Sequence, residues 1–297
     1  MVTKVRALSN TKHRFSVIRK ANKKYSTMAD DFSTSTASPE QAGASTPGDA
    51  PLFEIRNLSK WFGSIRALQE VDLDIRQGEV LGLLGDNGAG KSTLIKIISG
   101  IHQPTAGTIR SEGKEVQISS PQVAHSLGVE TVFQDLALIP NLSVVPNFFI
   151  AREMTWGFFG TFPRILRERA MEADVRETLK QLDIHIPSLR ITIDRLSGGQ
   201  RQAVAIARAL RWKAKLVILD EPTAALSVPE QQKVLSLSRQ LASQGIAVIY
   251  ITHNILDVMA VTDRLAILHR GRKAAEVATK DTTEHEIVSL IMGKAVR

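Results

Sequence analysis

The sequence predicts an α/β fold in which parallel strands end in residues suited to binding phosphate and metal. Three apolar runs support this prediction, at residues 79–84, 216–219 and 246–251, and each has the length of a buried strand. Each run is followed directly by glycine-rich or polar chain. Because the carboxyl ends of parallel strands meet at one edge of a sheet, the residues after the three runs should lie close together.

The run at 79–84 leads into a loop of the phosphate-binding type. Residues 85–93 read GDNGAGKST, which fits the pattern G-x-x-x-x-G-K-[ST] between a strand and a helix expected at 94–99. Its glycines allow backbone N–H groups and the helix N-terminus to converge on a polyphosphate, with Lys91 on the β- and γ-phosphates and Ser92 on Mg²⁺. A turn that fits by accident is the alternative. The expected nucleotide contacts are Gly85, Asp86, Asn87, Gly88, Ala89, Gly90, Lys91, Ser92 and Thr93.

The other two runs end in residues typical of phosphate hydrolysis. Asp220 and Glu221 follow the run at 216–219. At the carboxyl edge of a parallel sheet, Asp220 can hold Mg²⁺ through water, and Glu221 can polarise an attacking water molecule. His253 follows the run at 246–251 and is expected at the same edge. Acids that only mark a strand end and a structural histidine are the alternatives.

Two further features are weak when taken alone. Residues 196–200 read LSGGQ before a helix expected at 201–210, with Ser197 as its N-cap and two glycines that leave backbone N–H groups exposed. A capped surface helix would explain this stretch equally well. Phe62, upstream of the phosphate loop, could stack on a purine, although a single aromatic residue is more often part of a core.

The remaining chain predicts strands around a helical insertion. The strand pattern disappears between 135 and 195, where residues 163–182 read as an amphipathic helix. We therefore expect one domain at 51–297 with a helical subdomain at 135–196. The other expected strands are 52–55, 67–75, 108–110, 115–118, 128–133, 263–268 and 273–277, and the other expected helices are 121–125, 229–243 and 283–292.

Composition assigns the excess positive charge to one end of the chain. The 297 residues are 43% hydrophobic, include no cysteine and carry a net charge of +8. Eight of the 38 basic residues precede the first acid, Asp30, and the remaining 30 are matched by 30 acidic residues. No apolar run approaches the roughly 20 residues that cross a bilayer. A globular, neutral body with a basic leader is therefore expected.

Residues 1–50 are expected to be disordered. A basic segment is followed by a segment rich in Ser, Thr, Ala, Gly and Pro, with too little apolar surface to offset the entropy of ordering. A transit peptide and a basic arm that binds anionic surfaces are functional interpretations. We favour a third interpretation, in which Met28 is the true start.

The order of these motifs resembles that of ATP-binding cassette (ABC) ATPases over residues 52–293. The shared motifs are Phe62, GDNGAGKST, Gln134, LSGGQ, ILDEPT and His253. The position of LSGGQ, between the phosphate loop and the acidic strand, separates this family from other P-loop proteins. The resemblance implies a P-loop NTPase fold with a mixed-sheet core, an antiparallel β-subdomain and a helical subdomain, and an ATPase that uses ATP and Mg²⁺.

The resemblance also implies a dimer and residue roles. Two subunits would close head to tail on two ATP molecules, each held between the phosphate loop of one subunit and Ser197 and Gly199 of the other. Phe62 would stack on adenine, Gln134 would sense Mg²⁺ and water, and His253 would act as the γ-phosphate switch. The expected catalytic residues are Glu221, His253, Gln134 and Lys91. The expected metal ligands are Ser92, Gln134 and Asp220. The further expected nucleotide contacts are Phe62, Ser197, Gly198, Gly199 and Gln200.

Within the family, the chain is most similar to importers of monosaccharides such as ribose, xylose and fructose. The strings at 132–138 and 140–144 and EPTAALS carry this similarity, and residues 157–162 with the single-cassette length are similar to fructose-type members. This implies the ATP-hydrolysing subunit of a bacterial sugar importer on the cytoplasmic face of the inner membrane. Its partners would be an identical or paralogous cassette, separate membrane permease subunits and, indirectly, a periplasmic sugar-binding protein.

Two departures and two rival functions remain open. Ser227 stands where most relatives have Asp, and Pro146-Asn147 replaces an acid-Asn pair. A cassette for another substrate is one rival. The other is a non-transport ATPase acting on nucleic acid or the ribosome, or tethered to nucleic acid by its basic leader. Nucleic acid is not the expected partner, because the 62 residues between Gln134 and Ser197 are too few for the coiled coils of chromosome-type members.

Overall fold

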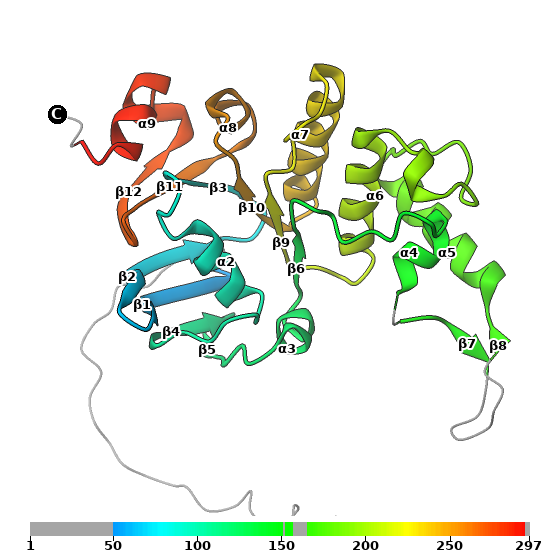
Figure 1. The fold of residues 1–297 in the computed structure, drawn as a ribbon, viewed down its shortest axis with the longest axis horizontal. Helices are drawn as coiled ribbons and strands as arrows, with labels where there is room; N and C mark the ends of the chain where they lie inside the picture. The colour runs from blue at the N-terminus through cyan, green and yellow to red at the C-terminus, as the bar shows by residue number, and fades with distance from the viewer. Residues whose placement is uncertain (1–49, 151, 157–164, 295–297) are drawn as a thin grey trace, which may run out of the picture. The chain divides into compact units, whose positions relative to one another are not determined.

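The computed structural model describes residues 50–150, 152–156 and 165–294 (Figure 1). All described residues belong to one compact unit. The expectations for the leader, including Met28, and for residues 157–162 lie outside the described residues. Among the helices that are described, none combines the length and apolar character needed to cross a bilayer.

A six-stranded mixed sheet forms the centre of the domain. Its strand order is β12-β11-β3-β10-β9-β6. The five strands from β11 to β6 are parallel, and β12 pairs with β11 antiparallel. The strands are β12 (Arg272–Ala278), β11 (Arg264–His269), β3 (Val80–Leu84), β10 (Ala247–Ile251), β9 (Leu216–Asp220) and β6 (Val129–Val132). The carboxyl ends of β3, β10 and β9 therefore lie at one edge, as the sequence predicts.

A second, four-stranded antiparallel sheet covers one side of this centre. Its strands, in the order β2-β1-β4-β5, are β2 (Ile65–Ile75), β1 (Phe53–Phe62), β4 (Ala106–Ser111) and β5 (Lys114–Glu115). Helix α2 (Lys91–Ile98) contributes Leu94, Ile95, Ile97 and Ile98 to the core that both sheets share. Figure 1 shows α2 beside this antiparallel sheet. The mixed sheet and the antiparallel sheet that the family resemblance implies are both present.

Alternating side chains of the central strands face two different cores. Leu81, Leu216 and Ile249 pack with α2 and the antiparallel sheet, whereas Val217 and Tyr250 pack with the helices. This alternation follows from the two-residue repeat of a strand. Strands that are buried on both faces must be apolar throughout, which explains the continuous runs in the sequence. The helices of the second core are α4 (Val144–Phe149), α5 (Glu168–Gln181), α6 (Gly198–Leu210) and α7 (Val228–Ser243).

Several predicted boundaries are wrong for identifiable reasons. The first strand continues through Phe62, because β1 and β2 form one long hairpin that pairs Phe62 with Ile65. The helix expected from residue 163 begins at Glu168, because residues of β8 (Ile165–Leu166) pair with β7 (Thr155–Trp156). Helix α6 begins at Gly198 rather than at 201. The remaining elements are α3 (Pro121–Ser126), α8 (Ile255–Val261), which was not predicted, α9 (Glu284–Ile291), and short 3₁₀ turns at Ile193–Arg195 and Thr279–Asp281.

Asn147 holds the loop that precedes α4 in the helical subdomain. Its side chain is fully buried. Asn147 Oδ1 accepts a hydrogen bond from the Ile139 N–H at 2.8 Å, and Nδ2 donates to the carbonyls of Ile139, Leu142 and Ser143 at 3.1, 3.2 and 3.0 Å. One amide therefore satisfies four backbone groups of this loop. The departure in this pair is Pro146, whereas Asn147 keeps the asparagine and has a structural role here.

Replacing Asn147 tests this role. Asn147→Ala is expected to lower the free energy of unfolding by about 2–4 kcal/mol, because buried backbone groups lose their partners. Urea denaturation followed by circular dichroism measures this change. Asn141→Ala, at an exposed position of the same loop, should stay within about 0.5 kcal/mol of the wild type. Equal stability of the two variants would contradict the assignment.

Candidate functional site

The phosphate loop connects β3 to α2 through strained glycine positions. Gly85 has φ 146° and Gly90 has φ 107°, which residues with a side chain rarely adopt. A Cβ on Gly85 would lie 2.3 Å from the Leu268 carbonyl oxygen, and one on Gly90 would lie 2.8 Å from that of Ala67. Residues 86–88 form the exposed tip of the loop, and Ser92 and Thr93 lie in the first turn of α2. The first N–H groups of this helix have no partners within it, so they are available to an anion.

Lys91 lies folded over this loop. Its ammonium group donates hydrogen bonds to the carbonyl oxygens of Gly85 at 2.5 Å and Asp86 at 3.1 Å. Burial lowers the pKa of Lys91, and the nearby carboxylates of Glu221, Asp86 and Asp220 act in the opposite direction. The lysine is therefore positioned at the loop with bonds to neutral carbonyls that a phosphate oxygen can replace.

Asp220 and Glu221 lie at the carboxyl edge of the central sheet. The N–H of Glu221 donates to the Ile251 carbonyl at 2.9 Å, which ties the end of β9 to the end of β10. Burial raises the pKa of Asp220, the Glu221 carboxylate raises it further, and the charge of Lys91 opposes the shift. A cation at this position would relieve both unfavourable effects on the Asp220 carboxylate.

These residues suit a metal ion that arrives with a phosphate. Mg²⁺ is usually bound by one or two carboxylates together with phosphate oxygens and water. Within the part of the chain that the structure describes, no three His, Asp or Glu side chains are arranged to hold a metal by themselves. Asp220 and Gln134 line one open hollow of about 760 Å³ together with Ile101, Phe133, Asp135 and Ala137. Asp220 and Gln134 therefore lie together as a partial ligand set that a nucleotide would complete, whereas the Ser92 hydroxyl lies in the first turn of α2.

His253 meets Glu221 at the same edge. His253 Nδ1 and Glu221 Oε1 are hydrogen-bonded at 3.0 Å. The histidine side chain is 83% exposed and the glutamate side chain is 19% exposed. The histidine therefore faces solvent, whereas the glutamate is largely enclosed by the protein. The structure thus brings together the two residues that follow separate strands, as the sequence predicts.

A buried hydrogen bond connects the loops behind this pair. The Thr223 hydroxyl donates to Asp257 Oδ2 at 2.5 Å, and both residues are buried. Thr223 lies two residues after Glu221, and Asp257 lies in the first turn of α8, four residues after His253. The bond therefore holds the Glu221 loop against the helix that follows His253. Sequence reasoning missed Thr223 and Asp257, because no local pattern pairs them.

Phe62 lies at the end of β1 with a partly exposed ring. Its side chain is 43% exposed. The His102 ring contacts it edge to face with centroids 5.3 Å apart, and Lys60 Nζ lies 5.1 Å from its centroid. The Trp61 N–H donates to Thr105 Oγ1, which fixes the end of the strand. The ring is held in place and retains surface for stacking on a planar ligand.

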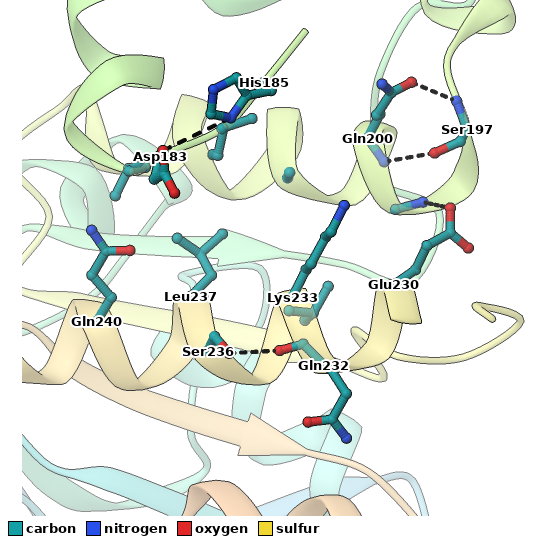
Figure 2. A pocket seen from close by; sticks show the side chains of 15 residues that line it. Asp183, His185, Ser197, Gln200, Glu230, Gln232, Lys233, Ser236, Leu237 and Gln240 are labelled. Carbon is teal, nitrogen blue, oxygen red and sulfur yellow. Dashed lines mark hydrogen bonds and ion pairs between the residues drawn. The ribbon is translucent and has the colours of Figure 1, made fainter. Parts of the chain in front are cut away.

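The LSGGQ residues lie at the N-terminus of α6, apart from the phosphate loop. Ser197 caps the helix, because its hydroxyl accepts from the Gln200 N–H at 3.2 Å while Gln200 Oε1 accepts from the Ser197 N–H at 3.0 Å (Figure 2). This capping box confirms the predicted N-cap. Ser197, Gly199 and Gln200 line a hollow of about 530 Å³ between α6 and α7 that includes no residue of the phosphate loop. One subunit does not bring the two motifs together.

Comparisons with known proteins give relatives of matching length. The family model described as ABC transporter matches residues 68–224. The xylose/arabinose import ATP-binding protein of Sulfolobus acidocaldarius is 48% identical over 82% of this chain and 95% of its own. The fructose import ATP-binding protein of Rhizobium meliloti is 43% identical over 82% and 94%. A ribose import ATP-binding protein of Ruegeria sp. is 38% identical, but the match covers only 47% of that protein.

Solved structures show the same fold. A nucleotide-free ATP-binding cassette from an ABC transporter superposes with a TM-score of 0.68 and 26% identity, over 82% of this chain and 95% of that one. A dimeric cassette in a post-hydrolysis state, bound to ADP and phosphate, superposes with a TM-score of 0.63 and 27% identity, over 76% and 98%.

The buried Thr223 bond can be tested by paired substitutions. Thr223→Val should lower the melting temperature by several degrees, because Asp257 stays buried without its donor. Thr223→Ser keeps the hydroxyl and should recover most of the loss. Differential scanning calorimetry measures both variants. A serine variant as unstable as the valine variant would show that packing of the methyl group, rather than the hydrogen bond, holds the loops.

Proposed function

This chain belongs to the ABC transporter family and is an ATP-hydrolysing cassette, and we propose that it powers the import of a monosaccharide. Two relatives of matching length are named for import of xylose/arabinose and of fructose, and a third relative is named for ribose. The observation that carries the catalytic part of the proposal is the edge of the central sheet. There the phosphate loop, Asp220, Glu221 and His253 converge.

ATP binding begins at the phosphate loop. Lys91 exchanges the carbonyls of Gly85 and Asp86 for oxygens of the β- and γ-phosphates, and the N-terminus of α2 binds the phosphates through its N–H groups. The ring of Phe62 stacks on the adenine. Ser92, Asp220 and Gln134 are the residues that would hold Mg²⁺, and the ion would supply positive charge beside the transferring phosphate.

Hydrolysis follows by in-line attack of water on the γ-phosphate. The Glu221 carboxylate orients the water and polarises its O–H bond. His253 Nδ1 lies 3.0 Å from that carboxylate and its side chain is exposed, so it can hold Glu221 in position, and in this proposal it reports the presence of the γ-phosphate. The Thr223–Asp257 bond keeps these two loops in register during the step.

A second cassette completes each nucleotide site. Within one subunit, the LSGGQ residues line a hollow that includes no residue of the phosphate loop. Two subunits related by a two-fold axis place the α6 N-terminus of each against the nucleotide of the other, which gives both sites at once. A dimeric relative that holds ADP and phosphate supports this arrangement. Head-to-tail closure on two ATP molecules is therefore part of the proposal.

The partner that receives this motion is a membrane permease. The apolar side chains of Ile139, Leu142 and Ile150 are exposed in the helical subdomain near Gln134. Asn147 fixes the loop that carries Ile139 and Leu142, and Ile150 follows at the C-terminal end of α4. In this proposal, ATP binding at Gln134 displaces this surface. We place the permease contact at residues 134–152, on the cytoplasmic face of the inner membrane, with a periplasmic sugar-binding protein acting through the permease.

Glu221→Gln tests the catalytic assignment. The amide keeps the shape of the side chain but cannot accept a proton, so ATP binding should persist while hydrolysis falls by at least about 100-fold. Phosphate release and binding of a fluorescent ATP analogue measure the two properties. Glu284→Gln, which removes a charge at an exposed position of α9, should hydrolyse ATP at the wild-type rate.

The same variant tests transport. A strain lacking the gene should lose uptake of at least one of labelled ribose, xylose, arabinose and fructose. The wild-type gene should restore that uptake and Glu221→Gln should not. Normal uptake of all four sugars in the deleted strain would contradict monosaccharide import, while undiminished hydrolysis by Glu221→Gln would contradict the catalytic role.

A further inference from the structure

Glu230 connects the N-termini of two helices. Its Oε1 accepts a hydrogen bond from the backbone N–H of Gly199, in the first turn of α6, at 3.0 Å. Its Oε2 accepts from the N–H and the hydroxyl of Ser227, the N-cap of α7, at 3.1 and 2.8 Å. Figure 2 shows the Glu230 side chain rising from α7 to the start of α6. The carboxylate therefore binds α6 with one oxygen and α7 with the other.

Its hydrogen bonds keep Glu230 ionised. The bond from Gly199, followed by those from Ser227 and Ser197, lowers the pKa of Glu230 to about 2. The carboxylate is thus an internal anion at the α6 N-terminus at any physiological pH. Anions are stabilised at such a terminus by its free N–H groups.

The side chain is also held by packing against Gly199. A Cβ built on Gly199 would lie 2.7 Å from Glu230 Cγ and 2.9 Å from its Cβ. The glutamate thus covers the face of Gly199 where a side chain would otherwise stand. Any other residue at 199 would place its Cβ too close to the Glu230 side chain of the same subunit, so one of the two would have to move.

Residue 227 allows this contact. Ser227 offers Glu230 two donors, its N–H and its hydroxyl. An aspartate at 227 would remove the hydroxyl donor and place a second negative charge beside Glu230. The serine at position 227 and the Glu230 carboxylate at Gly199 therefore belong to one hydrogen-bonded arrangement.

We propose that Glu230 makes closure of the cassette dimer selective for a nucleoside triphosphate, by occupying the Gly199 N–H until the γ-phosphate bound to a second copy of the chain displaces it. This inference rests on the proposed function, in which Gly199 contacts the partner's nucleotide. Two anions cannot share one N–H donor without strong repulsion. A γ-phosphate can replace the carboxylate, whereas ADP has no group to do so. The bonds to Ser227 hold the Glu230 carboxylate at the N-terminus of α7 after it leaves Gly199.

The experiment measures dimer formation by the full chain. In the Glu221→Gln background, sedimentation velocity with Mg²⁺ gives the ATP concentration at which half of the protein is dimeric, and the same titration is made with ADP. Glu230→Gln keeps the side-chain length and can retain the capping role, but it loses the charge. We expect it to lower the ATP midpoint by about 3- to 10-fold, because the neutral amide is displaced more readily, and to allow dimers with ADP.

Glu286→Gln is the matched control. Glu286 accepts from the Thr283 N–H and hydroxyl at 2.8 and 2.9 Å at the start of α9, so it is the same capping carboxylate away from α6. Its ATP midpoint should equal that of the background protein. Glu230→Asp keeps the charge but is too short to reach Gly199, and it should lower the midpoint as Glu230→Gln does. Its result decides the matter if Glu230→Gln fails to fold.

The outcomes separate this inference from the proposed function. A lower ATP midpoint for the Glu230 variants alone supports the inference. An unchanged or higher midpoint, with dimers still formed by the background protein, overturns the inference and leaves the proposed function intact. A background protein that stays monomeric with ATP overturns the proposed function, and the inference falls with it.

Discussion

The parallel pairing of β3, β10 and β9 is the constraint on which the rest of the molecule depends. Each strand is apolar throughout because the antiparallel sheet with α2 covers one face and the helices cover the other. Polar groups can therefore appear only where the strands end, and in a parallel sheet those ends share one edge. The phosphate loop, the Asp220–Glu221 pair and His253 are brought together by this packing.

The sequence predicts this edge well, because each of its parts lies within a few residues of a recognisable strand. It could not predict the side-chain contacts that join distant segments of the chain. Thr223 and Asp257 are 34 residues apart, and Gly199 and Glu230 are 31 apart. Such pairs depend on how α6, α7 and α8 pack against the sheet, and α8 itself is too short to show a helical period. The start of α5 was misjudged for a similar reason, because the pairing of β7 with β8 competes with helix propensity.

In both halves of the proposed nucleotide site, groups of the protein bind each other where the proposal places phosphate contacts. Lys91 rests on loop carbonyls where phosphate oxygens are proposed to bind. The α6 N-terminus rests on the Glu230 carboxylate, in place of the partner's γ-phosphate. In the proposed mechanism, nucleotide binding within one subunit releases the first contact and dimer closure releases the second. That order would link the chemistry at Glu221 to assembly, so that hydrolysis would wait for the second copy.

The central claim is that one site requires residues of two subunits, and mixing two variants tests it most directly. Lys91→Ala lacks the phosphate-loop cation, and Ser197→Arg blocks the α6 N-terminus. In a mixed dimer, one of the two sites combines the intact parts of both. The account predicts that each variant alone hydrolyses no ATP. An equimolar mixture should recover about a quarter of the wild-type rate, because half of the dimers are mixed and half of the sites in those dimers are complete. An inactive mixture, or full activity of Ser197→Arg alone, would contradict it.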